Sequence, residues 1–537
     1  MNRDLLATSA VALAILAIAC TGFFVFPGHA WLASDTQIYV PMLERLYDPG
    51  VLSRDLVATR VHLGWTAYDE IALLLRRTTS LPFQQVLAIE QFVFRALAVW
   101  GLYLIAASLG LARRFAVMVA GLVSLGATIP GPALLTFEYD PVPRGFALAL
   151  LLLAIGLALR GRANWAAAAG SLALLYHAPT TIPFWLVFGF LMARRRHWRP
   201  LVAPAVAAAV LVLLWRWQPG GVEWQPVLGR IGAAWEAILR LRAPYAWVSL
   251  WPRRLLWQYG LLWLVSVDAV ARLGTHRDGR RKAFCLGLPA MGVLSVPISY
   301  VLLEGLKWRM APQLQPARQV LWIALFAVLL SAVAAVAAAG RHRYPEALTW
   351  MLVVFLVPVH GDLLAPISWN RAALIFALAA VSVAAVRIGT ERWRLAAVPC
   401  TAVALAAMFA IPYLGRVRNY PDLRSPALEE LCAWGKSTPR DAVFLFPDAG
   451  RSLYPGIFRA EARRALYVDW KAGGQANFFE DLAIEWWRRW QAVMSDRPDP
   501  ARCRALGIDY LIVSPEHAPP GLSPAFRNAA FEAYRVP

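Results

Sequence analysis

A carboxylate stands at the end of the first long apolar run, in the segment Ser34-Asp35-Thr36-Gln37-Ile38-Tyr39. An aspartate at such a boundary can accept a proton from an attacking hydroxyl group or bind a divalent cation such as Mg²⁺ or Mn²⁺. Ser, Asp and Thr are also common N-cap residues, so helix capping is the structural alternative. Asp35 is therefore the first candidate for a catalytic or metal-binding residue.

A second polar group lies between residues 137 and 144. Glu138, Asp140 and Arg144 fall within eight residues, and two prolines stiffen the segment. Acids and an arginine placed in this way can orient a polar substrate or help to bind a cation. The alternative is a solvated loop whose arginine reaches from a helix start toward water.

Two basic side chains are candidates for binding substrate. His177 stands in a tight turn, Tyr176-His177-Ala178-Pro179, where it can bind a phosphate or hydroxyl group or be purely structural. Arg318 opens a long apolar run, and its guanidinium suits a phosphate group through bidentate hydrogen bonds. A helix-anchoring role is the alternative for Arg318, and Lys307 and Arg309 are nearby substitutes for it.

These residues are separated by apolar runs that are long enough to be membrane spans. The chain is 59% hydrophobic and only 16% charged, with a mean hydropathy of +0.51, which excludes an ordinary soluble protein. Runs close to the roughly 20 residues needed to cross a bilayer predict about 13 transmembrane helices. We expect them near 8–28, 86–109, 115–131, 145–160, 163–178, 180–193, 200–217, 256–272, 283–303, 319–340, 347–361, 371–388 and 395–413.

Alternate gaps between these runs hold almost only arginine, lysine and histidine. They lie at residues 113–114, 160–162, 194–199, 276–282, 341–343 and 387–394. Because cytoplasmic loops collect Lys and Arg, these gaps face the cytoplasm, and the gaps with mixed polar residues, Asp362 among them, face outward. The sequence thus predicts a multi-pass protein of a bacterial inner membrane with a cytoplasmic N-terminus.

The net charge of +20 does not indicate nucleic-acid binding. Residues 420–537 hold 15 Lys+Arg and 15 Asp+Glu, so the excess lies in the apolar part of the chain. There it is spread over loops and helix ends, as topology signals are, and forms no stripe that would follow a groove.

The chain divides into two predicted domains. Residues 1–418 form the membrane domain, with long outer loops at 30–85 and 218–254; the first reads as amphipathic helices. Residues 419–537 form a small periplasmic α/β domain, since short apolar β-rich runs at 443–446, 466–468 and 510–513 alternate with helical patterns.

Several residues of the C-terminal domain are given no site role. A solvated face, with contact to a substrate as the alternative, is predicted for Arg459, Arg463, Arg464, Asp469 and Lys471. Gly473-Gly474 is predicted to be a plain turn. Cys432 and Cys503 lie in this domain, where a disulfide is permitted, and their pairing is left open. No Cys/His spacing indicates zinc.

Ionisable residues within the apolar runs are expected to have partners. Glu90 and Arg95 lie five residues apart in the second run, so each is predicted to pair with another element.

The arrangement resembles the GT-C-type glycosyltransferases. The resemblance rests on an outward-running first helix, Asp35 at its outer end with Tyr39 four residues on, the long amphipathic first loop, many short-looped spans and an extracytoplasmic α/β tail. Those enzymes transfer sugars from polyprenyl-phosphate carriers, with a catalytic acid in the first outer loop. Their motif is often Asp-Glu or Asp-x-Asp, whereas Asp35-Thr36-Gln37 lacks the second acid.

The resemblance implies an inverting glycosyltransferase that passes a sugar from a polyprenyl-phosphate donor to an extracytoplasmic glycan, lipid or protein. Asp35 would be the general base or cation ligand, and Tyr39 a substrate contact. The auxiliary acids would be Asp55, from the same loop, with Glu138 and Asp140; the remaining substrate contacts would be Arg144, His177 and Arg318. The alternatives are a transporter or flippase of a lipid-linked or anionic substrate, and a non-catalytic scaffold of the same architecture.

Overall fold

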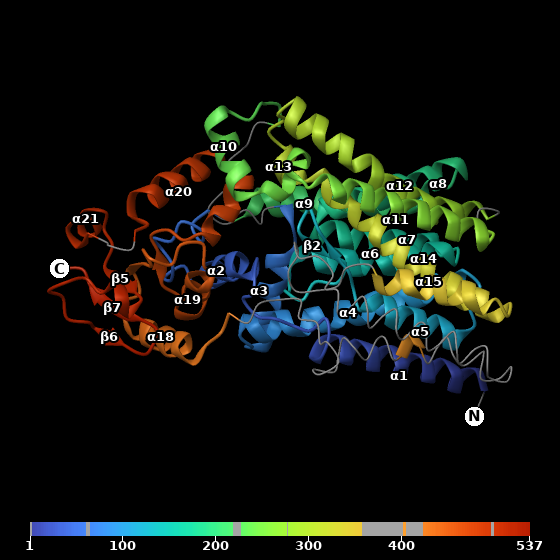
Figure 1. Ribbon diagram of the computed structural model, residues 1–537, viewed down its shortest axis with the longest axis horizontal. Helices are drawn as coiled ribbons and strands as arrows, with labels where there is room; N and C mark the ends of the chain where they lie inside the picture. The colour runs from blue at the N-terminus through green and yellow to red at the C-terminus, as the bar shows by residue number, and fades with distance from the viewer. Residues whose placement is uncertain are drawn as a thin grey trace.

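The computed structural model describes residues 3–60, 65–218, 227–275, 278–356, 401–403, 423–495 and 499–537. A helical body and a smaller C-terminal region lie at opposite ends of the long axis, and the N-terminus is at the end remote from the C-terminus (Figure 1). The predicted spans at 371–388 and 395–413, except for residues 401–403, fall outside the described residues. The end of the predicted span at 347–361 and Asp362 fall outside them as well.

The helical body follows the order of the predicted spans. Its helices are α1 (Arg3–Phe24), α2 (Thr36–Tyr47), α3 (Tyr68–Thr79), α4 (Phe83–Ser108), α5 (Arg113–Ser124), α6 (Pro143–Leu159), α7 (Ala163–Tyr176), α8 (Ala178–Arg194), α9 (Val202–Trp217), α10 (Ala233–Arg242), α11 (Arg253–Arg272), α12 (Gly279–Ser299), α13 (Ala311–Leu314), α14 (Leu321–Gly340) and α15 (Tyr344–Leu356). The amphipathic helices predicted in the first long loop are α2 and α3, as expected from their apolar spacing.

Five helical segments in the described chain are long and apolar enough to cross a membrane. They are Leu6–Phe24, Phe83–Ser108, Arg199–Trp217, Gly279–Gly305 and Ala311–Gly340. The fourth continues α12 through a π-helical turn, η6 (Tyr300–Gly305), and the fifth joins α13, a 3₁₀ turn η7 (Pro316–Val320) and α14. These segments define a multi-pass helical protein; the predicted total of 13 spans stays a prediction.

Small residues let the central helices approach closely. A Cβ on Gly101 of α4 would lie 2.4 Å from the backbone of Leu152 in α6, and one on Gly156 would lie 2.6 Å from Leu104. In lipid, where the hydrophobic effect does not drive helices together, the van der Waals packing that this close approach allows stabilises helix association. The apolar helix α14 lies at the centre of the helical body. Of the most apolar stretch of the segment Ala311–Gly340, 94% of the residues are buried.

The predicted span at 115–131 ends early. Helix α5 stops at Ser124, and the chain forms a two-stranded hairpin, β1 (Thr128–Ile129) and β2 (Leu134–Leu135). All four strand residues are buried, so the end of the apolar run that suggested a longer span forms a buried hairpin instead of continuing the helix.

The C-terminal region contains a five-stranded sheet in the order β4-β3-β5-β7-β6. The strands are β3 (Val443–Leu445), β4 (Ala465–Leu466), β5 (Tyr510–Val513), β6 (Phe526–Arg527) and β7 (Glu532–Arg535). β3 runs parallel to β4 and β5, and β7 runs antiparallel to β5. The three strands predicted from apolar runs are β3, β4 and β5, while the last two were not predicted because their residues are mixed in polarity.

Helices and one 3₁₀ segment accompany the sheet. They are α18 (Pro426–Ser437), α19 (Tyr454–Ala462), η9 (Lys471–Asn477), α20 (Glu480–Val493) and α21 (Pro500–Ala505). The boundary predicted at 418/419 lies outside the described residues, so the two-domain division stays a prediction. Cys432 and Cys503 are free thiols, and burial raises the pKa of Cys432 to about 12 and that of Cys503 to about 11.

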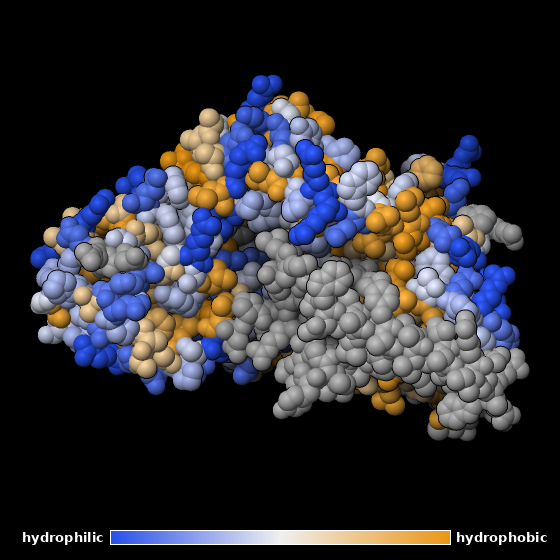
Figure 2. All heavy atoms as spheres, in the orientation of Figure 1, coloured by the Kyte–Doolittle hydropathy of each residue, from blue (hydrophilic) through white to orange (hydrophobic). Residues whose placement is uncertain are grey.

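The two ends of the molecule differ in surface character. On the face shown in Figure 2, the larger hydrophobic patches lie over the helical body, and the end formed by the C-terminal region is mainly hydrophilic. Large apolar side chains are exposed on the outer helices, including Val202, Val206 and Val212 of α9 and Trp257, Leu261 and Leu264 of α11. Such a surface suits contact with lipid at the helices and with water at the tail.

Candidate active site

A cavity of about 550 Å³ lies between the helical body and the C-terminal region. Seven of the eight predicted site residues line it: Asp35, Tyr39, Glu138, Asp140, Arg144, His177 and Arg318. Arg242, Lys471 and Asn477 line it too, and none of them is among the eight predicted site residues. Segments more than 400 residues apart in the chain therefore meet at one site.

An ion network at the cavity wall centres on Asp35. Its Oδ2 lies 2.5 Å from a guanidinium nitrogen of Arg144, and its Oδ1 lies 2.8 Å from Nζ of Lys471. Arg144 also pairs through Nε with Glu138 at 2.7 Å. The Asp35 side chain keeps 27% of its surface exposed, against 7% for Glu138, so Asp35 is the acid of this network that a substrate can reach.

The carboxylate of Asp35 does not cap the helix that it precedes. Asp35 occupies the N-cap of α2, yet its side chain makes no capping hydrogen bond. Burial raises its pKa, but the charges of Lys471 and Arg144 outweigh this effect and hold the pKa well below the usual range. The group is thus ionised and directed at the cavity, which answers the capping alternative.

Asp140 supplies the cap instead. Its two carboxylate oxygens accept hydrogen bonds from the backbone N–H of Thr36, at 3.1 Å, and from the Thr36 hydroxyl, at 2.6 Å. Burial raises the pKa of Asp140 to about 6, although the Thr36 hydrogen bonds favour the ionised form. Asp140 therefore fixes the start of α2, one residue after Asp35.

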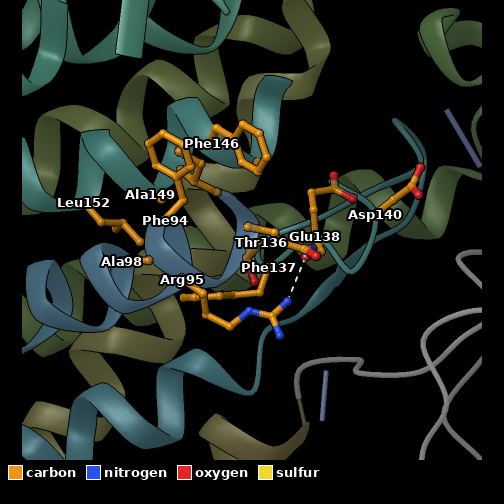
Figure 3. A pocket seen from close by; sticks show the side chains of 13 residues that line it. Phe94, Arg95, Ala98, Thr136, Phe137, Glu138, Asp140, Phe146, Ala149 and Leu152 are labelled. Carbon is orange, nitrogen blue, oxygen red and sulfur yellow. Dashed lines mark hydrogen bonds between the residues drawn. The ribbon is translucent and has the colours of Figure 1, made fainter. Parts of the chain in front are cut away.

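Arg95 holds the loop that carries Glu138 from behind. It donates hydrogen bonds to the carbonyl of Gly22 in α1 and, at 3.0 Å, to the carbonyl of Glu138. Figure 3 shows this contact beside a small apolar cavity between α4 and α6, with the carboxylates of Glu138 and Asp140 pointing away from it. The partner predicted for Arg95 on another element is thus this loop. Glu90 likewise has one, since it accepts a hydrogen bond from Tyr176.

Two arginines face the cavity without acidic partners. Within the described ranges, neither Arg318 nor Arg242 makes an ion pair, and Nε of each is buried without a hydrogen-bond partner. The guanidinium of Arg318 lies over the ring of Tyr245, 5.4 Å from its centroid, and that of Arg242 lies 4.4 Å from the ring centroid of Trp470. Unpaired guanidinium groups in a cavity favour an anionic ligand. The alternatives suggested for Arg318 lie elsewhere, with Lys307 bound to Glu236 and Arg309 to Glu480.

The C-terminal wall of the cavity is the segment η9, which the sequence analysis misread. Lys471 is only 11% exposed and forms part of the Asp35 network, so it does not belong to a solvated face. Gly473 is not a plain turn: a Cβ there would lie 2.5 Å from Nε of Arg242 and 2.6 Å from the ring of Trp486. The missing side chain lets Arg242 cross the segment and reach the cavity.

His177 and Tyr39 line the cavity with different supports. Nδ1 of His177 accepts a hydrogen bond from the backbone N–H of Thr180 and lies 2.8 Å from its hydroxyl, so the ring caps α8. The structural alternative given for His177 therefore has direct support. The Tyr39 ring packs against Tyr68, and burial raises the pKa of its hydroxyl, which keeps it a neutral hydrogen-bonding group.

Asp55 lies away from the cavity, so its position does not support the auxiliary role proposed for it. It is fully buried. Its Oδ1 accepts hydrogen bonds from the backbone N–H groups of Val57 and Ala58, and its Oδ2 accepts one from the backbone N–H of Leu466 in the edge strand β4. The sequence could not distinguish these uses, because an acid in the first loop suits either.

A second ion network lies beneath the cavity wall. Arg459 of α19 pairs with Asp469 at 2.7 Å and donates a second hydrogen bond to the backbone carbonyl of Gln37. The paired side chains are 0% and 1% exposed. The burial of this network contradicts the solvated face predicted for Arg459 and Asp469. The network also joins Gln37, two residues after Asp35, to Asp469, two residues before Lys471.

A divalent cation at Asp35 does not fit the residues present. Both carboxylate oxygens already bind cationic side chains. The other two acids that line the cavity are engaged as well, Glu138 by Arg144 and Asp140 by Thr36. Among the residues that the structure describes, no group of three or more His, Cys, Asp or Glu side chains is placed to hold a metal. A hard cation prefers several oxygen ligands, so Lys471 and a metal would compete for the same carboxylate.

One family model matches part of the chain, residues 426–493, as a domain of unknown function, DUF6798. The match covers α18, β3, α19, β4, η9 and α20, and so includes Lys471. No curated protein matches the sequence.

Several solved structures are similar over nearly the whole chain. ArnT from Cupriavidus metallidurans, bound to undecaprenyl phosphate, is similar over 99% of this chain and 97% of its own, at 14% identity and a TM-score of 0.49. The arabinofuranosyltransferase AftD from Mycobacteria is similar over 100% of this chain and 42% of its own, at 16% identity and a TM-score of 0.45.

An oligosaccharyltransferase from Archaeoglobus fulgidus, in complex with Zn and sulfate, is similar over 94% of this chain and 68% of its own, at 14% identity and a TM-score of 0.38. These structures are GT-C-type glycosyltransferases, the class that the sequence resembles.

Proposed function

We propose that the protein is a glycosyltransferase that moves a sugar from a polyprenyl-phosphate donor to an acceptor hydroxyl on the outer side of the membrane. One observation carries the proposal: a partly exposed, ionised carboxylate, Asp35, shares a cavity with two arginines, Arg242 and Arg318, that lack acidic partners. Transfer needs these two functions together, a base for the acceptor and cations for the leaving phosphate.

Asp35 acts on the acceptor. Its carboxylate accepts the proton of the attacking hydroxyl as the new bond forms between that oxygen and the anomeric carbon of the sugar. Its low pKa keeps it ionised at neutral pH, so it is ready to bind a hydroxyl group. Arg144 and Lys471 hold the carboxylate in place and limit its motion.

Arg318 and Arg242 act on the donor. The bond between the anomeric carbon and the phosphate oxygen breaks, and the polyprenyl phosphate leaves with a second negative charge. Guanidinium groups that are already desolvated stabilise this developing charge without reorganisation. The aromatic faces of Tyr245 and Trp470 keep the two groups in place.

The remaining predicted residues support this chemistry. Glu138 and Asp140 position Arg144 and the start of α2, while Tyr39 and His177 contribute hydrogen-bonding surface. We place the cavity on the periplasmic side of a bacterial inner membrane, with about 13 spans in residues 1–418 and a periplasmic domain at 419–537 that helps to select the acceptor.

Native mass spectrometry of the protein extracted from its own membrane tests the proposal. We expect a polyprenyl phosphate or its sugar conjugate to co-purify with the wild-type protein. Arg318→Ala should lose this lipid, whereas Asp35→Asn should keep it and lose transfer by about 10²- to 10⁴-fold, the usual contribution of general base catalysis. Asp48→Asn, an exposed acid of the same loop, is the matched control.

Two outcomes would contradict the proposal. Absence of lipid from every variant would remove the donor and leave transport as the function to test. Unchanged transfer in Asp35→Asn, measured with the co-purified donor, would remove the base.

A further inference from the structure

The C-terminal region contributes a cation to the catalytic carboxylate itself. Nζ of Lys471 lies 2.8 Å from Oδ1 of Asp35 and 3.3 Å from the hydroxyl of Ser34. The Lys471 side chain is 11% exposed, so solvent screens this contact far less than it screens a surface ion pair.

Three contacts of the neighbouring residue Asp469 fix the backbone that carries Lys471. Two residues before it, Asp469 is locked by Arg459, and the backbone carbonyl of Asp469 accepts a hydrogen bond from the indole N–H of Trp486. Just after Lys471, the N–H of Ala472 donates to the Asp469 carboxylate. A lysine anchored in this way is not a flexible surface side chain that meets Asp35 by chance.

The surroundings of Asp35 are those of a neutralised acid. Arg144 takes the other oxygen, so one carboxylate faces two cationic side chains. A divalent cation bound to an aspartate supplies positive charge between the acid and a phosphate oxygen. Lys471, on the wall of the same cavity as Arg242 and Arg318, already supplies that charge at that place.

We propose that Lys471 takes the place of a divalent cation at Asp35, so that binding of a lipid phosphate to this protein requires no metal ion. This inference rests on the proposed function for its lipid ligand. It also accounts for the absence of a second acid in Asp35-Thr36-Gln37, since a lysine needs one carboxylate where a divalent cation needs several.

The test has one arm with lipid and one without. In the lipid arm, undecaprenyl phosphate is titrated into the full-length protein in nanodiscs, with excess EDTA or with Mg²⁺. We expect the wild-type dissociation constant to change less than twofold between these conditions. Lys471→Met should weaken binding at least tenfold, and Lys307→Met, which removes an exposed lysine outside the cavity, should leave it unchanged.

The second arm measures Mn²⁺ directly by electron paramagnetic resonance, with no lipid present. If Lys471 occupies the cation position, wild-type protein and Asp35→Asn should bind the same amount of Mn²⁺. Mn²⁺ binding that is lost in Asp35→Asn would overturn the inference, as would a tenfold loss of lipid affinity in EDTA.

These arms separate the inference from the proposed function. Failure of undecaprenyl phosphate to bind the wild-type protein under any condition would contradict the proposed donor, while the Mn²⁺ comparison would still decide whether Asp35 holds a metal. Lys471→Met that folds, judged by an unchanged melting temperature, and binds lipid as the wild type does would overturn the role of Lys471.

Discussion

Two ion networks join the first long loop to the C-terminal region, and they differ in whether a ligand can reach them. The network of Asp35, Arg144 and Lys471 borders the cavity, with the Asp35 side chain 27% exposed. The pair of Arg459 and Asp469 lies a few residues away in sequence and is 0% and 1% exposed. Similar chemistry thus has two uses: charges that border a cavity can act on a ligand, and charges sealed from it can only fix the structure.

The buried pair of Arg459 and Asp469 should contribute strongly to the free energy of unfolding. Arg459→Met would leave the Asp469 carboxylate buried and unpaired, which typically costs about 3–5 kcal/mol. We expect the free energy of unfolding to fall by this amount, measured by denaturant titration in detergent. In contrast, Asp35→Asn should leave the protein folded, because the Asp35 side chain is partly exposed to the cavity and asparagine has nearly the same shape.

A matched control sharpens this prediction. Arg463 joins the same two parts of the chain through Glu44 but is 43% exposed, so Arg463→Met should cost less than about 1 kcal/mol. Equal losses in the free energy of unfolding for Arg459→Met and Arg463→Met would contradict the conclusion that the buried pair stabilises the fold more than the exposed one.

The pH dependence of stability should also separate buried acids from the open one. The pKa of Asp140 is raised to about 6, so its contribution to stability is fully present below the unfolded pKa near 4 and is lost as the pH rises through 6. A difference of about two pH units corresponds to roughly 3 kcal/mol. The pKa of Asp35 is lowered instead, so its contribution is present above about pH 4 and is lost only in stronger acid.

Thermal melting between pH 4 and 7 checks this sign. Wild-type protein should lose stability relative to Asp140→Asn as the pH rises, because Asn keeps both Thr36 contacts without titrating. Parallel pH profiles for the two proteins would contradict the predicted ionisation of Asp140.

The smallest effect concerns how the C-terminal region shapes the open network. Gly473→Ala should displace Arg242, since the added Cβ would lie 2.5 Å from its Nε. We expect about tenfold weaker binding of undecaprenyl phosphate, or about 1.4 kcal/mol. Gly260→Ala, whose Cβ would meet no atom within 4 Å, should bind as the wild type does. An unchanged affinity in Gly473→Ala would remove Arg242 from the phosphate site.

Local signals in the sequence predicted the helical body and most of one cavity wall. Apolar run lengths located the helices, and polar residues at their ends identified Asp35, Arg144 and Arg318. The other wall could not be predicted in this way, because the roles of Lys471 and Arg242 depend on contacts between segments distant in the chain. The same limit applies to Asp55, since its backbone partner Leu466 is 411 residues away in the chain.

The separation of 436 residues between Asp35 and Lys471 has a consequence for biosynthesis. Chains are made from the N-terminus, and their parts fold in that order. The helical body therefore enters the membrane with Asp35 in place but without its lysine. A chain that stalls before residue 471 therefore has an incomplete cavity, in which Asp35 lacks one of its two cationic partners until the C-terminal region has been made and folded.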